Sequence, residues 1–293
     1  MDKLFRNKKV IALFVLPGLL TYIVFFLYPI LSTVYYSGFK WNGYGDMVFV
    51  GLKNYVRLFT ADKTFVTGLK NILIMLGAVL FVQLPISLLL ALLLSRVQKG
   101  ARLIKTLFFV PIVFSATAVG LVWLRMFDST YGVINQLFAA LGIDYVQNWL
   151  CEPKRVMWAI CIPVVWCKIG YYLVILYAGI KSIPHDYYQA ALLDGCTGVR
   201  ATVKITIPLL RNVISMCAVL CAIGAIKEYP LIYVMTLGGP FKSSTTPAIQ
   251  MYLEAFTNSN FGYSSAIAVM LVVISLITYK LLHIILPTAD IQY

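Results

Sequence analysis

The sequence predicts an all-α integral membrane protein with about six transmembrane helices. The 293 residues are 61% hydrophobic and only 12% charged, whereas a soluble domain usually carries about 25% charged residues. The mean hydropathy is +0.86. Apolar stretches long enough to cross a bilayer cover residues 10–36, 69–94, 104–126, 156–180, 205–237 and 264–286. Few residues remain between them, so we expect a single membrane domain over residues 1–293.

The positive charge predicts which side of the membrane each loop faces. The net charge is +13, and three basic segments would lie on one side if all six spans are real. They contain Lys3, Arg6, Lys8 and Lys9 before the first span, Arg96, Lys99, Arg102 and Lys105 between spans two and three, and Lys181, Arg200, Lys204 and Arg211 around the link between spans four and five. Basic loops face the cytoplasm. We therefore expect two cytoplasmic termini, and no nucleic acid is needed to explain the charge.

The first apolar run is expected to remain as a transmembrane span. It is too long for the apolar region of a signal peptide, and no small-x-small cleavage site follows it. After it, Leu52, Tyr55, Val56 and Phe59 recur at helical spacing, with Lys53 and Arg57 turned away. This pattern predicts a short amphipathic helix along the outer membrane surface.

Sequence motifs for catalysis are absent. The chain has no phosphate-binding Gly-x-x-x-x-Gly-Lys-Ser/Thr, no His-Glu-x-x-His and no Gly-x-Ser-x-Gly. Its two histidines, His185 and His283, lie in different segments, and its six cysteines show no metal-binding spacing. We expect no catalytic residues, no metal site and no cofactor bound by this chain.

A polar segment between spans four and five, residues 181–204, is too long for a simple turn. "HDYYQAALLDG" reads as a short helix with Pro184 and Asp186 in its first turn and Gly195 at its C-terminal cap. Ala190 and Ala191 would give this helix a smooth surface that the groove of a second protein could approach. By the charge rule, the segment is cytoplasmic.

The spacing around this helix resembles the "EAA" loop of permease subunits of ATP-binding-cassette (ABC) importers. The family pattern is Glu-Ala-Ala, three residues, Gly, nine residues, Ile, one residue, Leu-Pro. Here it reads Gln189-Ala190-Ala191, Gly195, Ile205 and Ile207-Pro208 at the same spacing. Gln189 replaces the usual Glu and Ile207 the usual Leu, which puts any family salt bridge at the first position in doubt.

Other stretches resemble one group within this family, the sugar-type permeases. Within that group they are similar to the maltose-permease F-like and glycerol-phosphate-permease A-like subunits. These are "LFVLPGLLTYIVFFLYPILSTVYYSGF", "FVGLKNYVRLF", "YAGIKSIPHDYYQAALLDG" and "TLGGPFKSSTTPAIQMYLEAF". The resemblance covers nearly the whole chain. The extra N-terminal spans and large external insert of the maltose-type subunit are missing, so this chain looks like the shorter form.

The resemblance implies the type I ABC importer permease fold, with a core over residues 69–286, in the inner membrane. The chain would form half of a pathway for a carbohydrate, beside a second related permease. Two ATPase subunits would carry ATP and Mg²⁺, and an external solute-binding protein would deliver the solute. The coupling residues implied are Pro184, Gln189, Ala190, Ala191, Asp194, Gly195, Ile205 and Pro208.

Polar side chains inside the spans are candidates for the solute pathway, because they are expensive in a bilayer. Lys227 and Glu228 form a charged pair in the sequence, next to Tyr229 and Pro230. We expect them to line a central cavity, together with Gln83, Trp166, Lys168 and Tyr171. The alternative is that the charged pair lies at the outer interface and extends into water.

Two other functions remain open. An importer of this class could carry glycerol phosphate or another small polar solute. A secondary transporter without an ATPase would need ion-coupling acids within the spans, where Glu228 is the only obvious acid.

Overall fold

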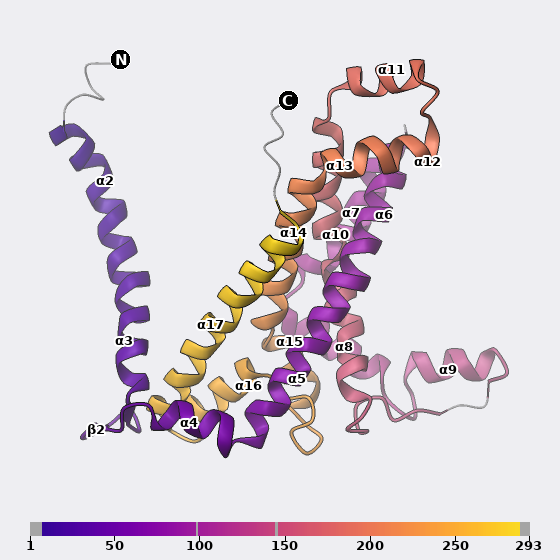
Figure 1. Ribbon diagram of the computed structural model, residues 1–293. Helices are drawn as coiled ribbons and strands as arrows, with labels where there is room; N and C mark the ends of the chain where they lie inside the picture. The colour runs from indigo at the N-terminus through magenta and orange to yellow at the C-terminus, as the bar shows by residue number, and fades with distance from the viewer. Residues whose placement is uncertain (1–7, 98, 144–145, 288–293) are drawn as a thin grey trace. The chain divides into compact units, whose positions relative to one another are not determined.

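The computed structural model describes residues 8–97, 99–143 and 146–287 (Figure 1). The basic residues Lys3 and Arg6 lie outside these ranges. The chain forms two compact units, one of Met1–Asp62 with Gln250–Met270 and one of Lys63–Ile249 with Leu271–Tyr293. Each unit is described by itself.

The first unit begins with an apolar helix in three parts, α2 (Lys8–Tyr22), η1 (Ile23–Leu27) and α3 (Tyr28–Ser37). Nearly all of its side chains are exposed, and none of its most apolar window is buried. A helix that is apolar all round and not covered by its own chain is suited to a lipid environment. This is the predicted first span.

A tight turn follows the first span, and it explains the Gly-Leu-x-Asn-Tyr sequence. Strands β1 (Phe39–Lys40) and β2 (Val48–Phe49) pair antiparallel, and Gly51 adopts a φ of +58°. The buried Asn54 donates its amide hydrogens to the carbonyls of Ser37 (2.8 Å) and Phe39 (3.0 Å). The segment therefore closes the end of the span by satisfying its backbone carbonyls.

The predicted amphipathic helix is confirmed as α4 (Lys53–Thr60). Leu52, Val56 and Phe59 are exposed on one side, while Asn54 and Leu58 are buried. The unit is completed by η4 (Leu253–Thr257), by the second half of α16 (Pro247–Tyr252) and by the first turns of α17 (Phe261–Ile285). The outward apolar stripe fits a helix that lies on a membrane surface.

The core of the second unit is α10 (Val156–Ser182). It packs against α6 (Leu84–Ser95), α7 (Ala101–Val113), α5 (Lys63–Ala78) and α14 (Arg211–Ile226). Gly170 allows the closest approach, because a Cβ atom there would lie 1.9 Å from the carbonyl oxygen of Phe108. Ile160, Leu173 and Leu176 of α10 are fully buried.

Prolines explain three of the four π-helical segments in the part of the chain that the structure describes. η1 ends two residues before Pro29, η2 (Val79–Gln83) two before Pro85, and η3 (Thr202–Thr206) two before Pro208. Proline has no N–H for the carbonyl four residues earlier, and its ring clashes with that carbonyl. The turn widens, and hydrogen bonds between residues i and i+5 replace the lost ones.

Two predicted spans are interrupted. The third divides into α7 and α8 (Ala116–Met126), which are bent by 95°. The fifth begins as α12 (Gly198–Ala201), η3 and α13 (Ile207–Leu209) and bends by 68° into α14. Helix α14 ends at Ile226, and after a short break the helix α15 (Pro230–Thr236) follows. The described chain thus has four unbroken helices long and apolar enough to cross a membrane, or six spans if each bent pair counts as one.

The cause of the first break is visible in the sequence. Ser115 leaves the helical conformation, and its Oγ accepts a hydrogen bond from the N–H of Ala118 at 3.1 Å, so it caps a new helix. A continuous helix over residues 104–126 would have lost this cap.

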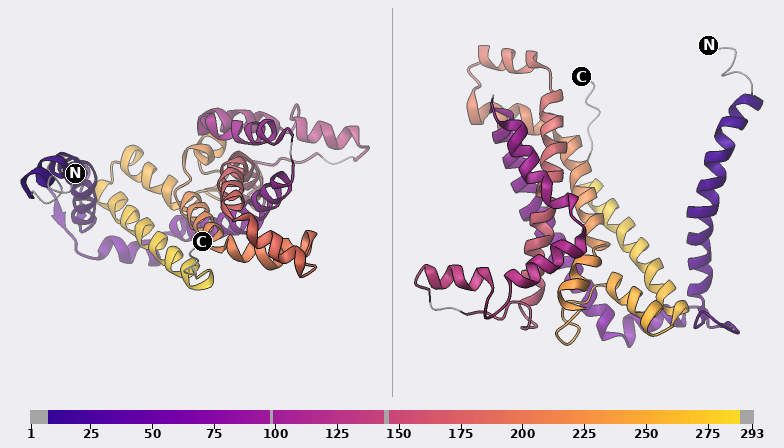
Figure 2. Two further views of the ribbon diagram at one scale, coloured as in Figure 1. Left: turned by 90° about the horizontal axis from the view of Figure 1, so that it is seen from above. Right: turned by 180° about the vertical axis from the view of Figure 1, so that it is seen from behind.

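The two ends of the second unit carry different loops. Helices α11 (His185–Leu193) and α12 lie at one end, and α9 (Val133–Ala140) lies at the other, as the opposite views in Figures 1 and 2 show. Arg96 reaches Gly198 and Thr202, and Lys181 reaches Ser95. The basic links after spans two and four therefore share one end, as the charge pattern predicts.

Candidate functional site: the α11 segment and the intramembrane ion pair

Helix α11 begins after Pro184 and ends in a glycine cap. Gly195 has a φ of +68°. Its N–H donates to the carbonyl of Leu192 (3.0 Å), and the N–H of Cys196 donates to the carbonyl of Ala191 (2.8 Å). These two bonds form a Schellman motif. The predicted cap at Gly195 is confirmed, and the helix ends in a sharp, defined turn.

Only one of the two alanines that were predicted to form a smooth surface on α11 is exposed. Ala190 is exposed, but Ala191 is buried, because it lies on the side of the helix that faces the rest of the unit. The exposed surface is instead apolar at its end, where Leu193 is 90% exposed and Leu192 is 64% exposed. Gln189 and Asp194 are exposed too.

The chain returns to the bundle through α12, η3 and α13. The Tyr188 hydroxyl lies 3.1 Å from that of Thr206, so one hydrogen bond connects α11 to η3. Ile205 is half-buried and Pro208 is exposed. Pro208 follows the widened turn η3, which it imposes on the backbone. The segment therefore has a fixed connection to the helix that crosses the membrane next.

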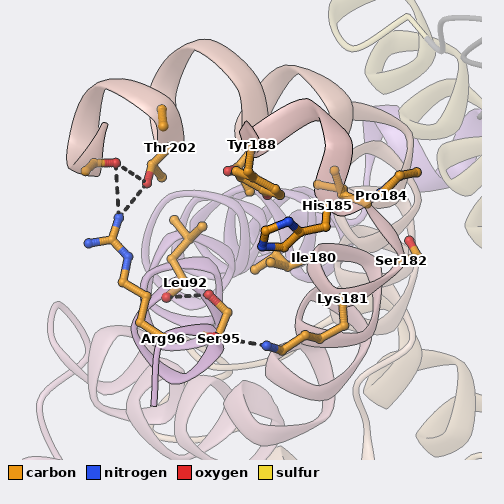
Figure 3. A pocket seen from close by; sticks show the side chains of 14 residues that line it. Leu92, Ser95, Arg96, Ile180, Lys181, Ser182, Pro184, His185, Tyr188 and Thr202 are labelled. Atoms are coloured by element: carbon orange, nitrogen blue, oxygen red, sulfur yellow. Dashed lines mark hydrogen bonds between the residues drawn. The ribbon is translucent and has the colours of Figure 1, made fainter. Parts of the chain in front are cut away.

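A cavity of about 790 Å³ lies between this segment and the ends of α6 and α10 (Figure 3). Arg96 and Lys181 reach it from below, and His185 and Tyr188 from α11. Sequence reasoning counted Arg96 and Lys181 only as charges that orient the loops. Nothing local to either residue indicates that they converge on one cavity.

Lys227 and Glu228, which are adjacent in the sequence, differ in burial. Glu228 is buried and accepts a hydrogen bond from Lys168 of α10, with Nζ and Oε2 2.5 Å apart, whereas Lys227 is exposed. Neighbouring residues on a helical turn point in different directions, and the chain leaves the helix at this place. The break between α14 and α15 thus holds an ion pair to α10.

The other predicted pathway residues lie in different surroundings. Gln83 is fully buried, and its Nε2 lies 3.3 Å from the sulfur of Cys221. Trp166 lies against Trp123, edge to face, and lines an apolar groove with Phe81 and Trp158. Tyr171 is exposed, and Tyr229 packs on Tyr233. Of the predicted set, Lys168 and Glu228 form a direct ion pair.

No group of three or more metal-binding side chains occurs within residues 8–97, 99–143 and 146–287. Among these residues, all six cysteines are free, and Cys217 and Cys221 are buried in α14. They pack as small apolar side chains.

The family model for the "binding-protein-dependent transport system inner membrane component" matches residues 83–290. The trehalose/maltose transport system permease protein MalF of Thermococcus litoralis is 30% identical, over 93% of this chain and 92% of that protein. The sn-glycerol-3-phosphate transport system permease protein UgpA of Yersinia pseudotuberculosis is 31% identical, over 89% of each.

A solved structure agrees in fold. A chain of a bacterial ABC transporter involved in the import of the acidic polysaccharide alginate superposes with a TM-score of 0.81 at 20% identity, over 97% of this chain and 96% of that chain. A second structure holds the same transporter with an alginate pentasaccharide-bound periplasmic protein. The chain therefore belongs to the family of binding-protein-dependent transport system inner membrane components and is a multi-pass permease subunit of an ABC importer.

Proposed function

We propose that this permease carries a carbohydrate, pairs with a second related permease, and docks on two ATPase subunits that bind ATP and Mg²⁺. The chain itself then binds no cofactor and catalyses no reaction. An external solute-binding protein delivers the solute. The relative that transports trehalose and maltose supports the solute class, and one observation carries the docking role: the apolar end of α11 is exposed beyond the ends of the bundle.

We propose that the exposed leucines of α11 hold the ATPase. Leu192 and Leu193 offer apolar surface, whereas Gln189 offers no charge at the position where the family has Glu. Burying two leucines contributes more than an exposed ion pair, which is worth about 0–1 kcal/mol. We therefore assign the docking energy of α11 to apolar contact. The coupling loop, residues 181–204, would pass the ATPase movement to α14 through η3 and Pro208.

The proposed solute pathway is centred on the Lys168–Glu228 ion pair. The pair has no net charge, and its donors and acceptors suit the hydroxyl groups of a sugar. Tyr171 and Tyr229 supply aromatic faces in the same parts of α10 and of the break. Gln83 supports α14 from within the core, and Trp166 lies outside this pathway.

Glycerol phosphate is the second candidate solute. Lys227 is exposed beside the ion pair, and an unpaired cation there would favour an anionic solute. The relative that transports sn-glycerol 3-phosphate supports this candidate.

The proposed orientation places both termini, α11 and the basic links in the cytoplasm of a cell with the chain in its inner membrane. The basic residues at the α11 end support it. The permease core would cover residues 69–286 after an N-terminal span at residues 10–36.

Leu193→Asp tests the docking role. We expect the purified chain to retain less than a tenth of the ATPase that accompanies the wild type, with unchanged thermal stability, because Leu193 packs on little of its own chain. Solute uptake falls in parallel.

Leu141→Asp is the matched control, since Leu141 is 70% exposed near α9 at the opposite end of the unit. It should keep the ATPase. Full ATPase retention by Leu193→Asp would contradict docking through α11, and equal loss in both variants would point to a general effect of the new charge.

A further inference from the structure

The cavity beneath α11 is basic and lacks acidic side chains. Fourteen residues line it, among them Arg96, Lys181, His185, Tyr188 and Thr202. Two carry full positive charges, and none carries a carboxylate. Hydroxyl groups and the His185 ring complete the polar lining (Figure 3).

The two cations are bound only to neutral acceptors. Arg96 Nη2 donates to the Thr202 hydroxyl (2.7 Å) and to the Gly198 carbonyl (3.3 Å). Lys181 Nζ donates to the Ser95 carbonyl (3.0 Å). Neither forms an ion pair with any carboxylate in the described part of the chain.

Two other cations of this unit are neutralised by a carboxylate. Lys168 is paired with Glu228, and Arg155 with Glu152. An arginine and a lysine that share a cavity without a counter-charge attract an anion, and their remaining N–H groups can bind its oxygens.

The length of α10 indicates that the cavity lies at the depth of the lipid headgroups. Helix α10 has 27 residues, which corresponds to about 40 Å of helix, against about 30 Å of hydrocarbon in a bilayer. Lys181 is in the last turn of α10, and Arg96 directly follows the last residue of α6. Both side chains therefore lie where two apolar helices leave the hydrocarbon.

We infer that this cavity binds a phosphate group, and that the phosphate belongs to an anionic phospholipid of the surrounding bilayer. Basic pockets between transmembrane helices bind phospholipid headgroups in this way. Arg96 and Lys181 hold the phosphate oxygens, and Tyr188 adds a hydroxyl donor. The headgroup connects α6 and α10 to the loop that carries α11.

The test uses the full-length chain with its co-purifying partners in nanodiscs of phosphatidylcholine, with and without phosphatidylglycerol. Native mass spectrometry counts the phosphatidylglycerol molecules retained and gives their apparent Kd. We expect the wild type to retain one tightly bound molecule that Arg96→Gln/Lys181→Gln loses, with affinity at least tenfold weaker. Lys181→Gln alone shows a smaller loss and leaves the Arg96 contacts intact.

Lys99→Gln/Arg102→Gln is the charge-matched control. Both residues are exposed near the same helix end and neither lines the cavity. Thr202→Val removes the hydroxyl that accepts a hydrogen bond from Arg96 but leaves both positive charges in place. This variant therefore distinguishes the effect of a loosened loop from the effect of losing the anion site. Both variants should keep the tightly bound lipid.

A second arm measures binding of inorganic phosphate to the complex in nanodiscs of phosphatidylcholine alone. Phosphate binding that the double variant abolishes, without retention of phosphatidylglycerol, supports the phosphate site and overturns the lipid as its source. Unchanged retention in Arg96→Gln/Lys181→Gln, or an equal loss in Lys99→Gln/Arg102→Gln, overturns the site. None of these readouts depends on solute uptake or ATPase docking.

Discussion

Helix α10 and the N-terminal span, Ile11–Ser37, have the same length of 27 residues and are both strongly apolar, yet they differ completely in burial. In α10, 61% of the most apolar window is buried, and in the N-terminal span 0%. Hydropathy therefore predicts that a segment enters a bilayer, but not whether its neighbours will be lipid or protein. Close packing in membranes depends on small residues and shape.

The largest effect is expected from the glycines of these two helices. A Cβ at Gly170 would overlap the backbone of Phe108 on α7, whereas a Cβ at Gly18 meets nothing within 4 Å. Gly170→Ala should cost about 3 kcal/mol or more and remove most of the folded protein. Gly18→Ala should leave it unchanged or slightly stabilised. Thermal unfolding in detergent and the amount of protein in the membrane measure both. Equal stability of Gly170→Ala and Gly18→Ala would contradict the difference in packing between the two helices.

Leucine truncation gives the next effect. Leu173 on α10 is fully buried against Leu94 and Ala101, so Leu173→Ala should cost about 2–5 kcal/mol through the cavity it leaves. Leu13 is 71% exposed in the N-terminal span, and Leu13→Ala should cost little in detergent. A large loss for Leu13→Ala would show that the span is packed against protein.

Breaking the ion pair should have an intermediate effect. Glu228→Ala leaves Lys168 unpaired and should cost about 2–3 kcal/mol, below the 3–5 kcal/mol of a fully buried pair, because the Lys168 side chain keeps 27% of its exposure. Lys227→Ala serves as control and should leave stability unchanged.

The double variant Lys168→Met/Glu228→Met separates the structural role of the pair from its role in transport. It should recover most of the stability but not the uptake of solute. Full uptake by this variant would exclude the pair from the solute pathway.

The smallest change in stability is expected at Gly195. Nothing lies within 4 Å of a Cβ there, so only the positive φ opposes a side chain, at a cost of about 1 kcal/mol. Gly195→Val should leave the chain inserted and folded but lower uptake severalfold, because the direction of α11 changes. Gly77→Ala, which also meets open space, is the control. Normal uptake by Gly195→Val would contradict the coupling role of this turn.

Features that depend on a few neighbouring residues could be predicted well. The amphipathic α4 follows from the spacing of Leu52, Val56 and Phe59, and the end of α11 follows from Gly195. The widened turns follow from Pro29, Pro85 and Pro208, although sequence analysis did not anticipate them. In each case the backbone near the residue provides the whole physical cause.

Features that need two distant segments could not be predicted. Lys168 and Glu228 are 60 positions apart in the chain, and Gln83 and Cys221 are 138 apart. Nor does the adjacency of Lys227 and Glu228 in the sequence reveal that Glu228 is buried and Lys227 exposed. Likewise, the alanine pair of the EAA pattern does not reveal that Ala191 is buried and Leu193 exposed.

The sequence by itself determined the membrane class, the spans, the side on which the basic links gather and the family pattern around α11, because hydropathy, charge and local spacing act on each segment alone. The tertiary structure decided which span is central, which acid neutralises Lys168, and that Arg96 and Lys181 share a cavity. These depend on which helices approach one another, since burial and ion pairing are properties of contacts between segments and not of the segments.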